Sequence, residues 1–269
     1  GCDIGEEALF GDGTRQVSIY TRTDVTIALV DIQAYRLLRT AGHPVAARIE
    51  ELVFLQQEAR LLELYERVAR HPRTAWERPS AALWDRIRSA PSGFSADRIV
   101  AALSRSPVFK NAPSEALVEL GTYMSIHSVN PGEIVTDKNH NQGNIYFLAA
   151  GSVAIVAPVL TAERRVATIG EGDFFGLGAT PNLAAKSSLL YFAQESSVLF
   201  GLSRPTWIEH APDLDTLGSV LRLALVRSAS KRLREAHEWI KTLDDCGRAP
   251  DTTSPRVQLW QHLTIHPTS

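Results

Sequence analysis

Gly5, Glu6 and Arg15, near the start of the chain, are residues whose types and spacing suit ligand chemistry. Gly5 allows the backbone to come close to an anion, so that the amides of this turn can face it. Arg15 stands ten positions after the glycine and offers a planar fork of donors suited to a phosphate. Glu6 only accepts hydrogen bonds when it is ionised, which suits the hydroxyls of a ribose. The segment therefore combines a group for phosphate with a group for sugar; the alternative interpretation is a glycine-rich hairpin with a solvated Arg and Glu.

The same segment resembles the phosphate-binding cassette of the cyclic nucleotide-binding domain family. The family pattern is Phe-Gly-Glu-x-Ala-Leu, a short variable stretch, and then Pro-Arg-x-Ala-Thr. In this chain Ile4 replaces the Phe, Thr14 replaces the Pro, and Val17-Ser18 replace the Ala-Thr. The resemblance implies that Glu6 binds the ribose 2′-hydroxyl and that Arg15 binds the cyclic phosphate. It predicts ligand contacts at Gly5, Glu6, Ala8, Leu9, Arg15, Val17 and Ser18.

Composition and charge narrow the class of protein. The chain has 269 residues, of which 44% are hydrophobic and 22% charged, as in soluble globular domains. Its net charge of −2 argues against a general nucleic-acid binder, which needs a basic surplus. Cys2 and Cys246 are too few for a disulfide framework or a zinc cluster and fit a reducing compartment, so we expect a cytoplasmic protein. We expect neither a membrane span nor a signal peptide, because no apolar run is long enough for a span and the start has no leader pattern.

Residues 1–71 are predicted to be the C-terminal part of a first cyclic nucleotide-binding domain. We expect strands within 18–30, followed by a helix that Asp31 caps and Gly42 ends. A long helix is then expected from Pro44 to about His71. A proline-rich linker with a short helix near 81–88 is expected over 72–94. The family's β-roll needs strands ahead of the cassette. We therefore expect either that the sequence begins within the domain or that another chain completes the roll.

A second copy is predicted over residues 95–243, followed by a tail over 244–269. Helical patterns cover 96–103 and 114–123, the latter capped by Ser114, and short strands are expected at 127–129, 133–135, 145–149, 153–157, 165–169 and 189–193. Turn glycines separate these strands in the order typical of the same family. We therefore predict an α+β fold, with antiparallel, jelly-roll-like β-rolls of tandem cyclic nucleotide-binding domains flanked by helices.

The second copy departs from the cassette pattern when it is aligned on Gly176. Leu177 takes the position of Glu6, and Lys186 takes the position of Arg15. Leucine cannot accept a bond from a ribose hydroxyl, and lysine keeps the charge but loses the fork; losing one charge-assisted bond costs about 1.5–3 kcal/mol. A weak second site is therefore predicted at Gly176, Leu177, Thr180, Lys186 and Ser187. This pocket either is purely structural or takes another anion through Lys186, Thr180 and Ser187.

The segment 206–243 is predicted to be nearly continuous helix, divided at Pro212. Between its apolar stripes lies a basic cluster, which we interpret as a solvated face: Arg227, Lys231, Arg232 and Arg234. Only 26 residues follow Leu243, too few for a winged helix. We therefore expect no direct DNA binding and a closer resemblance to regulatory subunits and multidomain sensors than to winged-helix transcription factors.

No group of residues stands out as suited to catalysis or to a metal. His262 and His266 have helical spacing but lack a third ligand. We therefore predict a non-enzymatic regulatory protein without a cofactor, which senses cAMP or cGMP and couples binding to a rearrangement of helices. Its long helices are expected to form a homodimer or to contact an effector protein. The alternative is a degenerate, nucleotide-free scaffold or dimerisation module.

Overall fold

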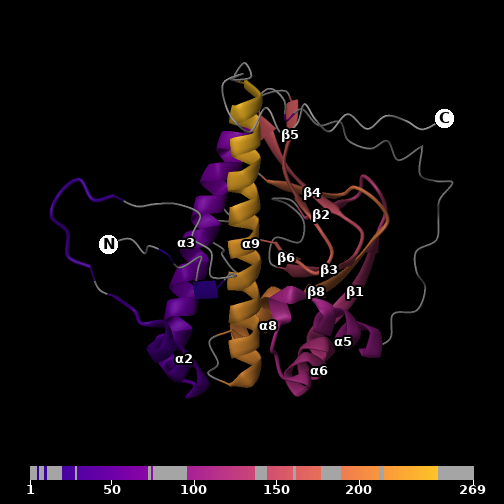
Figure 1. The fold of residues 1–269 in the computed structure, drawn as a ribbon. Coiled ribbons are helices and arrows are strands. Elements are labelled where there is room, and N and C mark those ends of the chain that lie inside the picture. The colour runs from indigo at the N-terminus through magenta and orange to yellow at the C-terminus, as the bar shows by residue number, and fades with distance from the viewer. Residues whose placement is uncertain are drawn as a thin grey trace, which may run out of the picture.

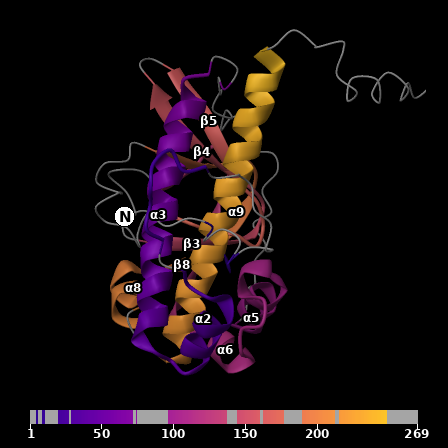
Figure 2. The ribbon, with the colours of Figure 1, turned by 60° about the vertical axis from the view of Figure 1, so that its left-hand side comes forward.

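The computed structural model describes residues 5, 9–10, 20–27, 29–71, 74, 96–136, 144–159, 162–176, 189–211 and 215–247. Two antiparallel sheets form a roll, and two long helices stand side by side along it, with α9 between α3 and the roll in the first view (Figures 1 and 2). Three shorter helices, α5, α6 and α8, lie near one end of the roll (Figure 1). No helix of the described ranges is both long enough and apolar enough to cross a membrane.

The roll consists of two four-stranded sheets in which every pairing is antiparallel. One sheet has the order β1 (Met124–Val129), β8 (Ser197–Leu202), β3 (Ile145–Ala150) and β6 (Phe174–Phe175). The other has the order β2 (Ile134–Thr136), β7 (Leu190–Ala193), β4 (Val153–Val159) and β5 (Ala162–Ile169). The predicted α+β fold with an antiparallel roll and flanking helices is confirmed.

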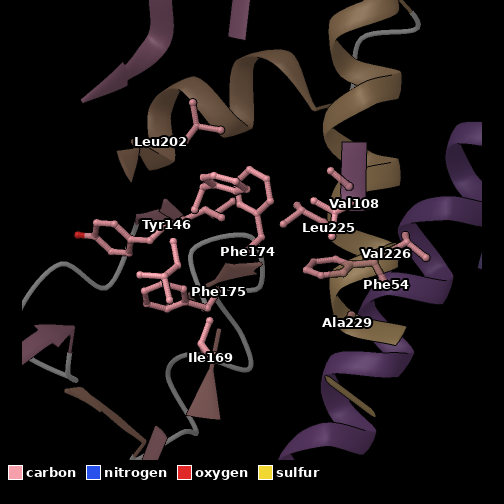
Figure 3. Close-up of a cluster of buried hydrophobic side chains, with 14 of the residues drawn as sticks. Phe54, Val108, Tyr146, Ile169, Phe174, Phe175, Leu202, Leu225, Val226 and Ala229 are labelled. Carbon is pink, nitrogen blue, oxygen red and sulfur yellow. The ribbon is translucent and has the colours of Figure 1, made fainter. Parts of the chain in front are cut away.

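Aromatic rings hold the two sheets together. Phe175 of the first sheet stacks on Tyr191 of the second, with ring centroids 5.6 Å apart. Tyr146, the cross-strand neighbour of Phe175 in the first sheet, also stacks on the Phe175 ring at the same centroid distance. Ring pairs of this kind stabilise a core beyond the area that they bury. Figure 3 shows these side chains continuing into residues of α9 and into Phe54 of α3, so roll and helices share one core.

The helices that the sequence predicts in the second copy are present. They are α5 (Ala96–Arg105), α6 (Ser114–Tyr123), α8 (Arg204–His210) and α9 (Thr216–Gly247). A 3₁₀ turn at Pro107–Phe109 was not predicted. The predicted cap at Ser114 is wrong, because Pro113 is the N-cap and makes no side-chain bond there.

Strands β6 and β8 were not among the predicted strands. All six residues of β8 are buried, so their sequence lacks the alternation that marks a strand with one solvated face. β6 is only two residues long.

The first part of the chain forms α2 (Ile32–Thr40) and α3 (Pro44–Ala69), as predicted. The Asp31 carboxylate caps α2 by accepting a 2.9 Å bond from the Ala34 amide. Gly42 adopts a φ of 62° in the turn before α3, which explains why glycine suits this position.

The strands predicted within 18–30 are wrong for the part that the structure describes. Residues 20–27 and 29–30 form no strand, and Ile27 and Leu29 are 71% and 89% exposed. The strands of the two sheets all come from residues 124–202, so among the described residues this segment has no ladder to join. Alternating apolar residues form a strand only when a neighbour accepts and donates the backbone bonds.

Helices α3 and α9 run in the same direction, in register. Gln57 of α3 donates a 2.8 Å bond to Ser230 of α9. One ion pair on each side of this bond links Glu50 to Arg222 and Glu58 to Arg232. The partners are separated by 172, 173 and 174 residues in the sequence. A nearly constant separation means that the two helices are parallel, as Figures 1 and 2 also show.

The interpretation of the basic cluster on α9 as a solvated face is wrong for Arg232 and incomplete for Arg227 and Lys231, which are partly exposed and also bond to the protein. Arg232 is 5% exposed and pairs with Glu58. Lys231 pairs with Asp173 at 2.6 Å, and Arg227 donates to the backbone carbonyls of Val108 and Lys110. The reason is tertiary: α9 contacts α3 on one side and the roll on another, so charged residues between its apolar stripes find partners in the protein.

The buried pair between the two long helices provides a test of this packing. Glu58→Ala would leave the buried Arg232 guanidinium without its charge partner, and we expect the free energy of unfolding to fall by about 3–5 kcal/mol. The matched control is Glu51→Ala on the same helix, where the carboxylate is half-exposed and pairs with Arg48. This control should cost less than about 1 kcal/mol. Urea denaturation of both variants measures the difference, and equal losses would contradict the buried pairing.

Candidate functional site

Few of the predicted ligand-binding residues belong to the described part of the chain. Gly5, Leu9 and Gly176 are described. The other predicted contacts lie outside the described residues: Glu6, Ala8, Arg15, Val17, Ser18, Leu177, Thr180, Lys186 and Ser187. For both predicted cassettes, the structure describes the opening glycines and the strands and helices that contact them.

The glycines that open the two predicted cassettes have the same kind of backbone. Gly5 has a φ of 85° and Gly176 a φ of 108°, a region that residues with a Cβ rarely adopt. At Gly176 a Cβ would also lie 2.6 Å from the Asn144 carbonyl oxygen. Glycine is therefore required at position 176 both by conformation and by close packing.

The second predicted cassette begins and ends on different sheets. β6 ends at Phe175, just before Gly176, and β7 begins at Leu190 in the other sheet. The stacked rings of Phe175 and Tyr191 bridge these two strands. Both ends of the segment are thus attached to one rigid aromatic core.

Helix α9 is bonded to the strand that leads into this cassette. The Ser228 hydroxyl accepts a 3.2 Å bond from the Phe174 amide and donates a 2.8 Å bond to the Phe174 carbonyl. One turn further on, the Lys231 ammonium pairs with Asp173. A displacement of β6 would therefore be transmitted directly to α9.

A cavity of about 340 Å³ opens where α3, α9 and β5 meet. Its volume falls in the range of small-molecule sites. The side chains that give it chemical character are Tyr65 from α3, Arg165 and Thr168 from β5, and Arg232, Glu235 and Trp239 from α9. The cavity therefore combines residues from both halves of the chain, which the sequence assigned to separate domains.

The cavity has an aromatic and cationic wall. The Arg165 guanidinium lies 5.9 Å from the centroid of the Trp239 ring, a cation–π arrangement. Burial raises the pKa of Glu235 above its ordinary value, while the neighbouring Lys231 opposes this rise. Burial also raises the pKa of Tyr65, so its hydroxyl stays protonated and can both donate and accept a hydrogen bond.

Two residues of this wall bury polar groups that interact with each other. The Tyr65 hydroxyl lies beside the Arg232 guanidinium, whose charge and hydrogen bond oppose the effect of burial on the Tyr65 pKa. Tyr65 is 2% exposed, and the Arg232 guanidinium also bonds to Glu58. These contacts compensate part of the cost of burying the two polar groups.

A second polar cluster joins the first predicted cassette to the long helices. Phe10, one residue beyond the predicted contact Leu9, packs edge-on against Tyr35 of α2 with ring centroids 5.5 Å apart. The Tyr35 hydroxyl donates a 2.8 Å bond to Glu50 of α3, which also accepts a 3.0 Å bond from Arg222 of α9. One chain of contacts therefore runs from Phe10, within the first predicted cassette, to α9.

Sequence reasoning missed the residues of the cavity. Arg232 was interpreted as solvated, and Tyr65 lies within the long helix predicted from Pro44 to about His71 without being assigned a role. No local pattern pairs residues that are far apart in the sequence and meet only through helix packing. The one usable signal was that Trp239 and the basic residues lie on the same helix as the apolar stripes.

Comparisons with known proteins return structural similarity alone. No protein-family model and no curated protein matches the sequence. Among solved structures, a cyclic nucleotide-binding domain from Methylobacillus flagellatus matches with 16% identity and a TM-score of 0.45, over 55% of this chain and 83% of that chain. The regulatory subunit of a cAMP-independent protein kinase A from Trypanosoma cruzi, bound to guanosine, matches with 17% identity and a TM-score of 0.40, over 57% and 52%. The catabolite activator protein of Thermus thermophilus matches with 23% identity and a TM-score of 0.38, over 52% and 63%. The match thus spans about half the length of the kinase regulatory subunit.

The glycine that opens the second predicted cassette can be tested by adding one methyl group. Gly176→Ala should lower the free energy of unfolding by about 1–3 kcal/mol, because the new Cβ must avoid the Asn144 carbonyl from an unfavourable backbone conformation. The control is Gly170→Ala, where a Cβ meets nothing within 4 Å. This control should stay within about 0.5 kcal/mol of the parent. Thermal denaturation compares the two, and a control that loses as much as Gly176→Ala would refute the packing argument.

Proposed function

We propose that this chain is a non-enzymatic regulatory protein that senses a cyclic nucleotide, cAMP or cGMP. The observation that carries the proposal is the pattern from Gly5-Glu6 to Arg15, with Leu9 at the expected position between them. The positive φ of Gly5 supports it, because a tight glycine turn lets backbone amides approach a phosphate. In this proposal Glu6 binds the ribose hydroxyl and Arg15 the cyclic phosphate.

The chain is proposed to contain two tandem copies of this domain, over residues 1–71 and 95–243, joined by the linker 72–94 and followed by the tail 244–269. The same order of elements in the two copies supports this division: a capped short helix is followed by a long helix. The N-cap residues Asp31 and Ser203 stand before α2 and α8, and each of these helices precedes a long helix. The two long helices α3 and α9 then pair in register.

Ligand binding is proposed to act on the helices through the contacts of Phe10. A ligand shifts an equilibrium only through its different affinity for two states. A change in the cassette that moves Phe10 would disturb its packing on Tyr35, and with it the bond from Tyr35 to Glu50. Glu50 also holds Arg222, so this disturbance would reach α9.

An effector protein is proposed to contact the long helices on the side that solvent reaches. Val45 and Leu52 of α3 are 47% and 42% exposed, and Leu37 of α2 is 72% exposed. Val45 and Leu52 stand seven positions apart on α3 and so share one face of that helix, and exposed apolar faces are typical of interaction surfaces. Helices α3 and α9 pair with each other within one chain, so an effector would contact the faces of these helices that point away from their interface.

A second candidate function is a nucleotide-free scaffold. It is favoured by Leu177 and Lys186, which replace the expected Glu and Arg of the second cassette. The closely packed α3–α9 pair also suits a structural role. The two predictions that follow separate a sensor from a scaffold.

The first cassette can be tested with one arginine. Arg15→Ala should weaken binding of cAMP or cGMP at least about tenfold, because a bound phosphate would lose its charged partner. Arg22→Ala, an exposed arginine a few residues beyond the motif, should leave the affinity unchanged. Isothermal titration calorimetry of the full chain with each nucleotide measures both variants. Unchanged affinity in a folded Arg15→Ala chain would refute the assignment of this site.

The second cassette can be tested by restoring the family pattern. The double variant Leu177→Glu with Lys186→Arg should bind cyclic nucleotides more tightly than the parent in an Arg15→Ala background, where the first site is silenced. Each single change should gain less, because a lone Glu repels the phosphate and a lone Arg lacks the ribose contact. Calorimetric titration of the four chains provides the comparison. Tight binding by the unrestored second cassette would contradict its predicted weakness.

A further inference from the structure

An excess of positive charge gathers where α2 meets the two long helices. Arg39 of α2 and Arg222 of α9 both pair with Glu50 of α3, at N–O distances of 3.4 and 3.0 Å. Arg227, further along α9, donates to two neutral backbone carbonyls instead. Three arginines and one glutamate carry a net charge of +2, and together with Tyr35 we call them the arginine junction. Figure 1 shows α2 at the end of the helix pair where both long helices begin.

Two guanidinium groups of this junction repel each other. Burial lowers the pKa of Arg227, and the charge of Arg39 lowers it further, while Tyr35 and Glu50 oppose this effect. Arg39 and Arg227 also act together on the buried Tyr35 hydroxyl. Like charges at a partly buried site are screened less than charges in water, so their repulsion costs more. An anion bound between the two guanidinium groups would turn this repulsion into attraction.

The same two arginines have donors that a ligand could use. The Arg39 Nε is buried and lies near Glu50, but it makes no hydrogen bond to any described residue. The carboxylate of Glu50 instead accepts bonds from Tyr35 and Arg222. Arg227 uses a single nitrogen, Nη1, for both of its carbonyl bonds. The Arg39 side chain is 36% exposed and Arg227 is partly exposed, so a small solute can reach both.

We propose that the arginine junction is a binding site for a phosphate dianion, which Arg39 of α2 and Arg227 of α9 hold between them. Arginine forks bind phosphate oxygens with paired, charge-assisted hydrogen bonds. Inorganic phosphate or a phosphate monoester carries close to two negative charges near neutral pH and so matches the excess charge of the junction. The cyclic phosphate of cAMP or cGMP is a diester with one negative charge, which matches it less well. The inference goes beyond the proposed function, because neither arginine belongs to a predicted cassette.

A phosphate in this position would connect α2 directly to α9. Tyr35 of the junction packs against Phe10, and its hydroxyl bonds to Glu50. A bound dianion would therefore hold in place the same contacts through which the first cassette is proposed to act on the helices. Phosphate would be a second input to these helices, separate from the cyclic nucleotide.

Calorimetric titration of the full chain with inorganic phosphate tests the site. The titration is done at about pH 7.5, where phosphate monoesters are doubly charged, and in chloride at constant ionic strength so that screening does not change. Arg39→Gln should weaken phosphate binding at least about tenfold, because one charge-assisted partner is lost. The matched control is Arg36→Gln, at an exposed arginine on the same helix, and it should leave the affinity unchanged. A parallel titration with AMP distinguishes free phosphate from a phosphorylated small molecule as the source.

The melting temperature without phosphate separates binding from a structural role. Arg39→Gln should melt at an equal or higher temperature than the parent, because Glu50 keeps Arg222 and Tyr35 while the repulsion of Arg227 falls. If Arg39→Gln does not fold, Arg39→Lys keeps the charge without the fork and should still weaken phosphate binding by about three- to fivefold.

Four outcomes decide the inference. Phosphate binding that depends on Arg39 supports the site, and AMP binding that is tighter but equally dependent on Arg39 assigns it to a phosphorylated small molecule. Equal affinities in the Arg39→Gln and Arg36→Gln chains would overturn the inference, as would the absence of binding by either probe. The proposed cyclic nucleotide function is measured separately through Arg15, so it would stand or fall independently of these results.

Discussion

Two buried ion pairs between α3 and α9 hold the rest of this structure in position. Glu50 meets Arg222 near the start of the helix pair, and Glu58 meets Arg232 about two turns later. A shift of one helix along the other would separate both buried pairs, which is far more costly than the loss of exposed pairs. The pairs therefore select one register and one direction among the many that apolar stripes alone would tolerate.

This register determines what each helix can contribute to the roll. Because α3 is parallel to α9, its C-terminal half reaches the end of the roll where β5 lies, and Tyr65 enters the wall of the cavity. α9 is in turn bonded to β6 through Ser228 and Lys231, immediately before Gly176. The helix pair is thus joined to the strand before the predicted second cassette and, through Tyr35, to Phe10 within the first. A change at either cassette has a short physical path to the same two helices.

Local physical chemistry was enough to predict most of the elements. The Asp31 cap, the glycine turn at Gly42 and the proline that opens α3 depend on a few neighbouring residues, and all three are present. Strands of the roll with turn glycines between them were found for the same reason. Prediction failed where the outcome depends on neighbouring strands. Residues 20–27 and 29–30 alternate like a strand, but in the described part of the chain no neighbouring strand pairs with them. Strand β8 does pair with neighbours, but all its residues are buried, so its sequence does not alternate between apolar and polar.

The sequence by itself determined the roll, the long helices, and the glycines that open both predicted cassettes, because each depends on backbone conformation or on periodicity within one segment. Only the tertiary structure decided that Arg232 is buried, that α3 packs on α9, and that Tyr65 and Trp239 line one cavity. The reason is that a charged residue on a helix has the same local signature whether water or a carboxylate from 174 residues away receives it. Which of the two it meets depends on the packing of the whole chain, and that packing carries no mark in the neighbouring residues.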